Sequence, residues 1–334
     1  MSGGPSSSSR RPSRRAALGL LAAAPAALSV GLGAALAPAR VFAAARHVYD
    51  LAPRQVADGI WMVEGATEYF TRENGGAIVN IALVETPRGV IVVDTGPSRR
   101  YGEALRAAAQ LIHPLGAQEA LITHHHPDHF FGNQVFADLP IRALGPTGLM
   151  ATQMGDAYAD NLYRMLGDWM RGTEPTPPTR VLQPGPVEIL GRRFQALALK
   201  GHTASDLALL DEATGVLIAG DLAFLDRAPT TPDADIAEWR ASIAALDALS
   251  PAAVIPGHGP FDPARASLRQ TDAYLEWLDA RLRRAAADGL DMMDIIREGP
   301  PGRFASLGAM PQELSRSTAH LFPTIEREVL PRAN

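Results

Sequence analysis

The sequence predicts an α/β fold, and three observations support that prediction. Apolar segments of strand length alternate with segments of helical periodicity through most of the chain. Histidine and aspartate residues recur where the expected strands end, which is where α/β proteins build their sites. Of the 334 residues, 46% are hydrophobic and 20% are charged, a composition that suits a globular enzyme with a sizeable core.

The first half of the expected fold consists of four strands and one helix. A polar loop separates the first two strands, which are expected to pair, and a Pro-Arg-Gly turn leads into the third. The third strand is continuously apolar, as is typical of a strand buried on both faces. An amphipathic helix follows, and the fourth strand runs directly into a histidine-rich segment. The expected strands are 59–65, 76–86, 90–93 and 120–123, and the expected helix is 98–113.

The second half alternates less regularly. A helical insert and a proline-rich connection come first, and two pairs of strands follow, each joined by a polar turn. A helix with apolar residues at helical spacing, one more strand and a mainly helical C-terminal part complete the chain. In order, the expected segments are the insert 147–171, the connection 173–186, the strand pairs 187–190 with 194–199 and 207–210 with 216–219, the helix 236–249, the strand 253–255 and the helical part 265–334.

The N-terminus is typical of an export signal. Residues 1–15 are serine-rich and end in two arginines, 16–36 are rich in alanine and leucine, and the segment 41–45 closes with three alanines. Paired arginines before a mildly apolar run resemble a twin-arginine signal, which predicts a periplasmic or secreted bacterial protein. The alternative is a membrane anchor, because the run is nearly long enough to span a bilayer. Its alanine and glycine content, with Pro25 and Pro38, argues against a stable anchor.

We therefore expect three parts: a cleaved signal in 1–45, a catalytic domain in 46–290 and a helical extension in 291–334. The formal net charge is −5, and the cationic residues form no stripe, so we expect a small-molecule substrate and neither nucleic acid nor an anionic membrane as a partner. The chain contains no cysteine. Any metal site must therefore use histidine and carboxylate ligands.

The most specific feature is the segment His124-His125-His126-Pro127-Asp128-His129. Imidazole nitrogens and carboxylates are good ligands for divalent ions, and alternate residues of an extended loop point the same way. Taken alone, such a segment is also typical of a turn or an adventitious surface chelator.

Four residues elsewhere in the chain favour a real metal site over a turn or a surface chelator. Each of them follows an expected strand, and the carboxyl ends of strands meet at one edge of a sheet. Two are histidines preceded by glycine, whose small size allows a close approach of the backbone. These residues are Asp94, His202, Asp221 and His258.

Five motifs in this order resemble the metallo-β-lactamase superfamily. They lie within residues 59–260 and are Asp94-Thr95-Gly96, Thr123-His124-His125-His126-Pro127-Asp128-His129, Gly201-His202-Thr203, Gly220-Asp221 and Pro256-Gly257-His258-Gly259. The resemblance implies an αββα four-layer sandwich of two mixed β-sheets flanked by helices. It also implies a site for two metal ions. The implied roles are a first metal on His124, His126 and His202, a second on Asp128, His129 and His258, a bridge by Asp221, and support of the ligand loop by Asp94.

Asp221 restricts the branches of the superfamily that this chain resembles. Antibiotic-degrading members usually have cysteine or serine at this turn, whereas thioesterase, lactonase and sulfatase branches have a bridging aspartate. Segments 74–80, 98–102 and 228–232 also resemble the quinoprotein relay system zinc metallohydrolases. That resemblance implies an association with a periplasmic quinoprotein system.

The leading hypothesis is a dinuclear hydrolase, in which a metal-bridging hydroxide attacks an ester, thioester or lactone carbonyl. Asp128 and Asp221 are then catalytic residues as well as ligands, and the expected cofactor is two Zn²⁺ per chain, with iron or manganese as alternatives. The other hypotheses are a mononuclear-iron oxidoreductase such as a persulfide dioxygenase, a β-lactam hydrolase, and a non-catalytic metal-binding accessory of a quinoprotein. The sequence leaves the substrate and the oligomeric state open.

Other residues receive weaker interpretations. His125 has the wrong alternation for a ligand, and we expect it not to bind metal. Asp206 either orients a ligand or is an ordinary residue at a strand entry. Residues 68–70 either form part of a substrate lid or belong to a solvated loop. His47, His113 and His320 lack any partner pattern and are expected to be surface or packing residues.

Overall fold

A computed structural model describes residues 47–330 of the chain. The expected export signal in 1–45 lies outside these described residues. The chain from Arg46 onward forms one compact unit. None of the helices in the described part has the length and apolar character needed to cross a membrane.

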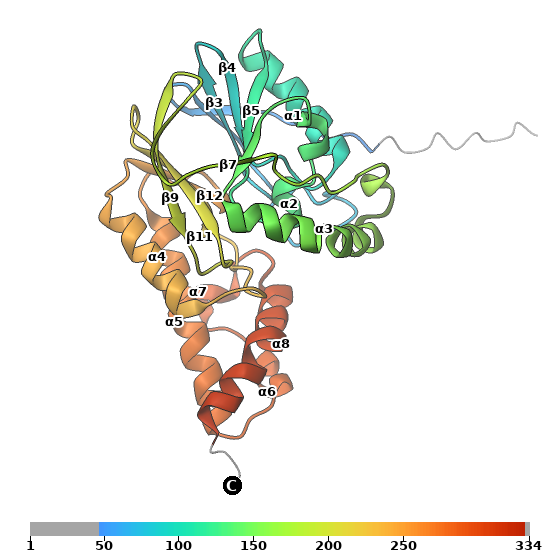
Figure 1. The fold of residues 1–334 in the computed structure, drawn as a ribbon. Coiled ribbons are helices and arrows are strands. Elements are labelled where there is room, and N and C mark those ends of the chain that lie inside the picture. Colours follow the sequence, from blue (N-terminus) through green and yellow to red (C-terminus); the bar gives the residue numbers. More distant parts are fainter. Residues whose placement is uncertain (1–46, 331–334) are drawn as a thin grey trace, which may run out of the picture. The chain divides into compact units, whose positions relative to one another are not determined.

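Two mixed sheets form the centre of the fold (Figure 1). The first has seven strands in chain order, antiparallel as far as β4 and parallel from β4 onward. These strands are β1 (Arg54–Ala57), β2 (Ile60–Val63), β3 (Ile81–Thr86), β4 (Gly89–Val93), β5 (Ala117–Leu121), β6 (Ile141–Ala143) and β7 (Arg180–Val181).

The second sheet has five strands in the order β12-β11-β10-β9-β8. Only β11 and β12 run parallel; the other neighbours are antiparallel. These strands are β8 (Gly185–Ile189), β9 (Arg192–Leu199), β10 (Asp206–Asp211), β11 (Val216–Phe224) and β12 (Ala253–His258).

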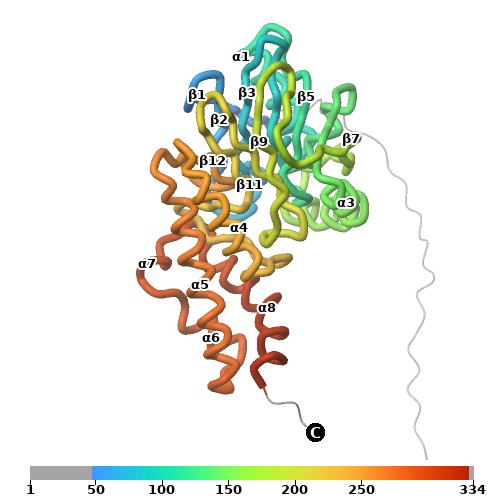
Figure 2. Tube along the Cα trace, turned by 60° about the vertical axis from the view of Figure 1, so that its left-hand side comes forward, coloured from blue at the N-terminus to red at the C-terminus, as the bar shows by residue number. Residues whose placement is uncertain are grey.

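Helices cover the outer faces of both sheets and extend beyond the second (Figure 2). They are α1 (Arg99–Ile112), α2 (Pro127–Phe130), α3 (Gly145–Leu166), α4 (Ile236–Ala248), α5 (Ala266–Ala287), α6 (Met292–Glu298), α7 (Gly302–Ala305) and α8 (Met310–Val329), with 3₁₀ turns η1 (Asn133–Phe136) and η2 (Gly167–Met170).

The apolar core defines the layers. One buried cluster contains side chains of both sheets, such as Ile91 of β4 and Ile218 of β11, so the sheets pack face to face. A second cluster joins the other face of the first sheet to Leu105 of α1. A third joins the second sheet to Trp239 of α4 and Leu268 of α5. The four layers are helix, sheet, sheet and helix, which confirms the predicted α/β sandwich.

Most predicted elements are confirmed, including the antiparallel pair 207–210 with 216–219. The strand expected over 76–86 begins only at Ile81, because the preceding backbone bonds to other loops. Asn80 donates its backbone N–H to the Gly257 carbonyl, and Ile78 offers its carbonyl to His258. Strands β1 and β6 were not anticipated, and β7 lies within the expected proline-rich connection.

Candidate metal centre

The loops after β4, β5 and β9 meet the last residues of β11 and β12 at one edge of the sandwich (Figure 1). All seven predicted ligands come together there, and each is buried. They form a first ligand group of His124, His126 and His202, together with Asp221, and a second ligand group of Asp128, His129 and His258.

Local structure around Pro127 separates the ligands of the histidine-rich segment. His126 has extended backbone angles, whereas Pro127 begins the short helix α2, which carries Asp128 and His129. Proline suits the first position of a helix because the N–H it lacks would have no helical partner. The change from extended to helical backbone directs His124 and His126 to one group and the helical pair to the other.

Asp221 lies between the two ligand groups. Its Oδ2 is 3.3 Å from Nε2 of His202, 3.3 Å from Nε2 of His258 and 3.9 Å from Nε2 of His124. Its Oδ1 is 3.2 Å from Nε2 of His129. The carboxylate therefore reaches both groups at once, as a bridging ligand must.

The strand expected to end before Asp221 continues instead to Phe224, so Asp221 lies within β11. The register of β11 with β12 shifts around Gly220, which turns the strand locally. At Gly257 in β12, an added Cβ would overlap Oδ1 of Asp221. Glycine at 257 is thus a steric requirement for the position of the central carboxylate.

The second ligand group also converges on a common point. Oδ2 of Asp128 is 3.5 Å from Nε2 of His258 and 3.7 Å from Nε2 of His129. In the first group, Nδ1 of His126 is 2.9 Å from Nε2 of His202. Such spacings place the donor atoms close enough to share an ion within each group.

Hydrogen bonds behind the ligands fix their ring orientations. Asp94 Oδ2 accepts from Nδ1 of His129 at 2.8 Å, and both Asp94 oxygens accept from Thr123. Nδ1 of His258 donates to the Ile78 carbonyl at 2.7 Å. In both histidines the Nε2 atom is thereby left to face the site. The Asp94 carboxylate therefore holds the ring of His129 in place.

Sequence reasoning missed Asp233. This residue lies in the loop between β11 and α4, and its Oδ2 is 2.8 Å from Nε2 of His126. The bond leaves Nδ1 of His126 facing the first ligand group. No spacing pattern connects the two residues, which are 107 positions apart.

The electrostatics of the site suit a cation. Burial lowers the pKa of His124 and His202 well below the ordinary imidazole value, so both rings are neutral, as metal ligands must be. Burial alone would also lower the pKa of His129, but nearby carboxylates, Asp221 first, raise it well above its ordinary value. Burial alone would raise the pKa of Asp221, yet the imidazoles of His258 and its neighbours lower it well below its usual range.

Several donor atoms of the site have no hydrogen-bond partner among the described residues although they are fully buried. These atoms are Nε2 of His124, Nε2 of His129, Nδ1 of His202 and Oδ1 of Asp221. Leaving buried polar atoms unpaired costs about 1–3 kcal/mol each. A bound ion removes that cost for the atoms that face it, so this set of nitrogen and oxygen donors fits divalent metal ions.

Two further candidate residues, His125 and Asp206, lie next to residues of the metal site. His125 is buried, which lowers its pKa to about 4, and it lies in a possible ligand cluster with His126 and Asp233. Asp206 accepts from Thr203, next to His202, and burial raises its pKa to about 7.

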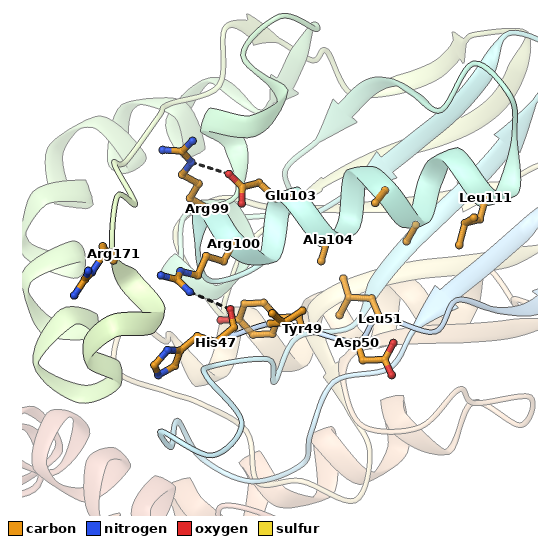
Figure 3. Close-up of a pocket in the computed structure, with 13 residues that line it drawn as sticks. His47, Tyr49, Asp50, Leu51, Arg99, Arg100, Glu103, Ala104, Leu111 and Arg171 are labelled. Carbon is orange, nitrogen blue, oxygen red and sulfur yellow. Dashed lines mark hydrogen bonds and ion pairs between the residues drawn. The ribbon is translucent and has the colours of Figure 1, made fainter. Parts of the chain in front are cut away.

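A cavity of about 650 Å³ lies along α1 and is lined by His47, Arg99, Arg100 and Leu111 among others (Figure 3). None of the seven predicted ligands lines it. His47 packs edge-on against Trp169, as expected of a packing residue. His320 is exposed on α8.

Comparison with known proteins identifies the family. The family model described as the metallo-beta-lactamase superfamily matches residues 74–258, more than half of the chain, and this range contains all seven predicted ligands. The chain belongs to the metallo-β-lactamase superfamily.

Individual relatives are more distant. A hydroxyacylglutathione hydrolase of Albidiferax ferrireducens is 29% identical over 173 residues, which are 51% of this chain and 57% of that protein. Among solved structures, a metallo-β-lactamase from Pontibacter korlensis has a TM-score of 0.56 at 20% identity and covers 68% of this chain and 99% of its own. FIM-1 from Pseudomonas aeruginosa in its mono-zinc form has a TM-score of 0.55 at 20% identity, covering 69% of this chain and 96% of its own. These structures support the fold.

Proposed function

We propose that this protein is a hydrolase that holds two divalent metal ions, with Zn²⁺ as the expected metal, and cleaves an ester, thioester or lactone. The position of Asp221 carries the proposal, because this carboxylate lies within 3.9 Å of four ligand imidazoles from both groups. A carboxylate so placed holds two cations close together. When bound, such ions lower the pKa of a water molecule and polarise a carbonyl.

The chain's own residues keep this site in place and limit its contact with solvent. Phe224 stacks on the ring of His258 with centroids 5.2 Å apart, and Trp239 packs edge-on against His202 at 4.9 Å. Both aromatic side chains are fully buried. Apolar walls of this kind strengthen the electrostatic interactions within the site.

Asp221 and the hydroxyacylglutathione hydrolase relative together favour a thioester over a β-lactam. The donor set contains no thiolate, since the chain has no cysteine. Asp128 and Asp221 are the two carboxylates of the site, and each approaches imidazoles of the second ligand group. We assign both to the catalytic centre.

The test combines metal analysis with turnover on thioester, lactone and β-lactam substrates. We expect two divalent ions per chain and the highest kcat/KM on a thioester. A double variant, His126→Ala with Asp128→Ala, removes one ligand from each group and should abolish turnover. The control His320→Ala changes an exposed histidine of α8 and should leave turnover unchanged. A single iron per chain with oxygen consumption, or full metal loading without any hydrolysis, contradicts the proposal.

We further propose export to the periplasm or the cell exterior. The twin arginines and the apolar run of the first 45 residues support this location. Replacing both Arg14 and Arg15 by lysine should retain the protein in the cytoplasm, as measured by cell fractionation. Export of the variant at the normal level contradicts a twin-arginine route.

The quinoprotein relay branch is a separate proposal, supported by segments 74–80, 98–102 and 228–232. Deletion of the gene in its host should reduce growth on an alcohol oxidised by a periplasmic quinoprotein. Restoration of growth by the inactive double variant would indicate a non-catalytic accessory role.

A further inference from the structure

A buried asparagine connects the turn that carries His258 to the segment before β3. Asn80 is 4% exposed and directly precedes β3. Its side-chain nitrogen donates to the carbonyls of Pro256 and Gly259, at 2.8 and 2.7 Å. Its side-chain oxygen accepts from the N–H of Gly65 at 2.9 Å. Both amide hydrogens and the amide oxygen are thus used, and all three partners are backbone groups.

These partners fix the orientation of the carboxamide. Two carbonyl oxygens require the NH₂ group, and the backbone N–H of Gly65 requires the amide oxygen. In the opposite orientation, the Asn80 oxygen would face two acceptors and its nitrogen would face a donor. Among side chains of this length, only asparagine offers two donors together with an acceptor.

The bonds hold every residue of the turn 256–259. One side-chain bond of Asn80 precedes His258 in the sequence and the other follows it, so the amide spans the residue that carries the ligand imidazole. The backbone N–H of Asn80 donates to the Gly257 carbonyl at 2.8 Å. His258 in turn donates from Nδ1 to the Ile78 carbonyl at 2.7 Å. The turn therefore has little freedom to move relative to the segment before β3.

The same turn supports the central carboxylate. The backbone of Gly257 packs on Asp221, since an added Cβ would overlap Oδ1. At Gly259 an added Cβ would overlap the carbonyl of Leu225, and the Leu225 N–H donates to the His258 carbonyl at 3.1 Å. The turn is thus packed against the residue that follows β11. A displacement of the turn would therefore move a ligand of the second group and the central carboxylate together.

We propose that Asn80 is a positioning residue of the metal centre. It sets the place of the His258 imidazole and, through Gly257, of the central carboxylate. The inference rests on the proposed function, in which both of these side chains bind metal. Among the described residues, no hydrogen bond of the Asn80 side chain reaches a ligand side chain, so its effect passes through the backbone of the turn. A neutral amide suits this role because it satisfies two buried carbonyls without adding charge beside the ligands.

The main test is Asn80→Asp in the metal-loaded full chain. The substitution keeps the shape of the side chain but places oxygens against two carbonyls, which should shift the turn. We expect the affinity for the second-group ion to fall about 10- to 100-fold, as measured by competition with a chromophoric chelator. The kcat should fall about tenfold, and KM should change by less than about twofold. Charge alone would have the opposite effect on metal affinity, because an added carboxylate attracts cations.

Two further variants separate positioning from stability. Asn80→Ala removes the amide without placing an oxygen against the carbonyls. It should lower the same affinity, and it provides the comparison if Asn80→Asp does not fold. The control is Thr86→Val, because Thr86 ends the same strand, is also 4% exposed and donates to the Gly89 carbonyl. This control should lower thermal stability and leave both metal affinities unchanged; a loss of affinity equal to that of the Asn80 variants overturns the inference.

A spectroscopic measurement makes the result independent of turnover. In the cobalt-substituted protein, the hyperfine-shifted Nδ1–H resonance of His258 is assigned with His258→Gln. It should move in both Asn80 variants and stay in place in Thr86→Val. Lower second-ion affinity with a moved resonance supports the inference even if no substrate is hydrolysed, an outcome that contradicts only the proposed function. Unchanged affinity with an unchanged resonance in both Asn80 variants overturns the inference, including when hydrolysis is normal.

Discussion

The two ligand groups offer similar donor atoms but differ in what holds those atoms in place. In the second group, His129 is fixed by Asp94, which is 2% exposed and is itself held by two hydrogen bonds from Thr123. His258 is fixed by the carbonyl of Ile78, a backbone group. The supports of this group are buried and leave little freedom to the rings.

The first ligand group is supported less uniformly. Nδ1 of His124 is 3.0 Å from the hydroxyl of Thr123, which Asp94 holds. His126, in contrast, depends on Asp233, whose side chain is 46% exposed. Nδ1 of His202 has no hydrogen-bond partner within residues 47–330. Outer partners tune metal affinity, so we expect the ion of the first group to be held more weakly and to leave first on titration with a chelator.

Asp221→Asn should have the largest effect, because this residue alone reaches both groups. An amide of the same shape loses the negative charge that attracts both ions. We expect kcat to fall by about 10³-fold, since several kcal/mol of transition-state stabilisation depend on the ions. Metal content should fall below two per chain in elemental analysis. A variant that retains both ions and stays within tenfold of the wild-type kcat contradicts the central role of Asp221.

Gly257→Ala tests the same carboxylate through sterics. The added Cβ would overlap Oδ1 of Asp221 and displace it. A shift of this kind should reduce kcat by about 10²-fold while the protein still folds. The matched control is Gly145→Ala, because a Cβ at that position meets no atom within 4 Å. Equal activity of the two variants would show that the Asp221 position tolerates movement.

Asp94→Asn tests whether the buried carboxylate that holds His129 is needed for metal binding by the second group. The variant weakens the bond to His129 and disturbs the bonds from Thr123, so affinity for the second-group ion should fall about 10- to 100-fold. Competition with a chromophoric chelator measures each affinity. The control Asp262→Asn alters another buried carboxylate, which bonds to Ser267 away from the ligands. It should lower thermal stability and leave metal affinity unchanged; equal affinity losses in both variants would contradict a specific role for Asp94.

The sequence was sufficient to predict the elements that carry strong local patterns. Continuous apolar residues predicted β4, and short apolar runs joined by polar turns predicted the strand pairs β8–β9 and β10–β11. Residues 76–80 were assigned to a strand because they are apolar, but their backbone groups bond to the loops around Gly257 and His258 instead. Such contacts join segments about 180 residues apart, so local composition cannot predict them.

Dependence on contacts between distant segments also explains why sequence reasoning missed a residue of the site. The ligands were recognisable because they occur in a dense motif or follow glycine at a strand end. Asp233 is an ordinary charged residue in a loop, and only the fold places it near His126. Its side chain is also partly exposed, which is the usual state of an aspartate and gives no signal in the sequence.

Asp233→Asn should have the smallest effect of the series, because its partial exposure weakens the support it gives to His126. We expect the affinity for the first-group ion to fall about three- to tenfold, less than the loss in Asp94→Asn. The hydrogen bond with His126 lowers the pKa of Asp233 from 3.8 to about 2. A carboxyl group whose pKa is lowered by folding stabilises the folded state above the unfolded pKa, and that stabilisation is lost as the pH falls through the folded value.

Unfolding of the metal-free proteins tests this pH dependence. The stability difference between the wild type and Asp233→Asn should decline as the pH falls from about 5 toward 2. If Asp94→Asn and Asp233→Asn cost the same metal affinity, exposure of the outer partner does not decide how firmly a ligand is held. The contrast between the two ligand groups would then have to arise from the ligands themselves, above all from the carboxylate that Asp128 adds to the second group.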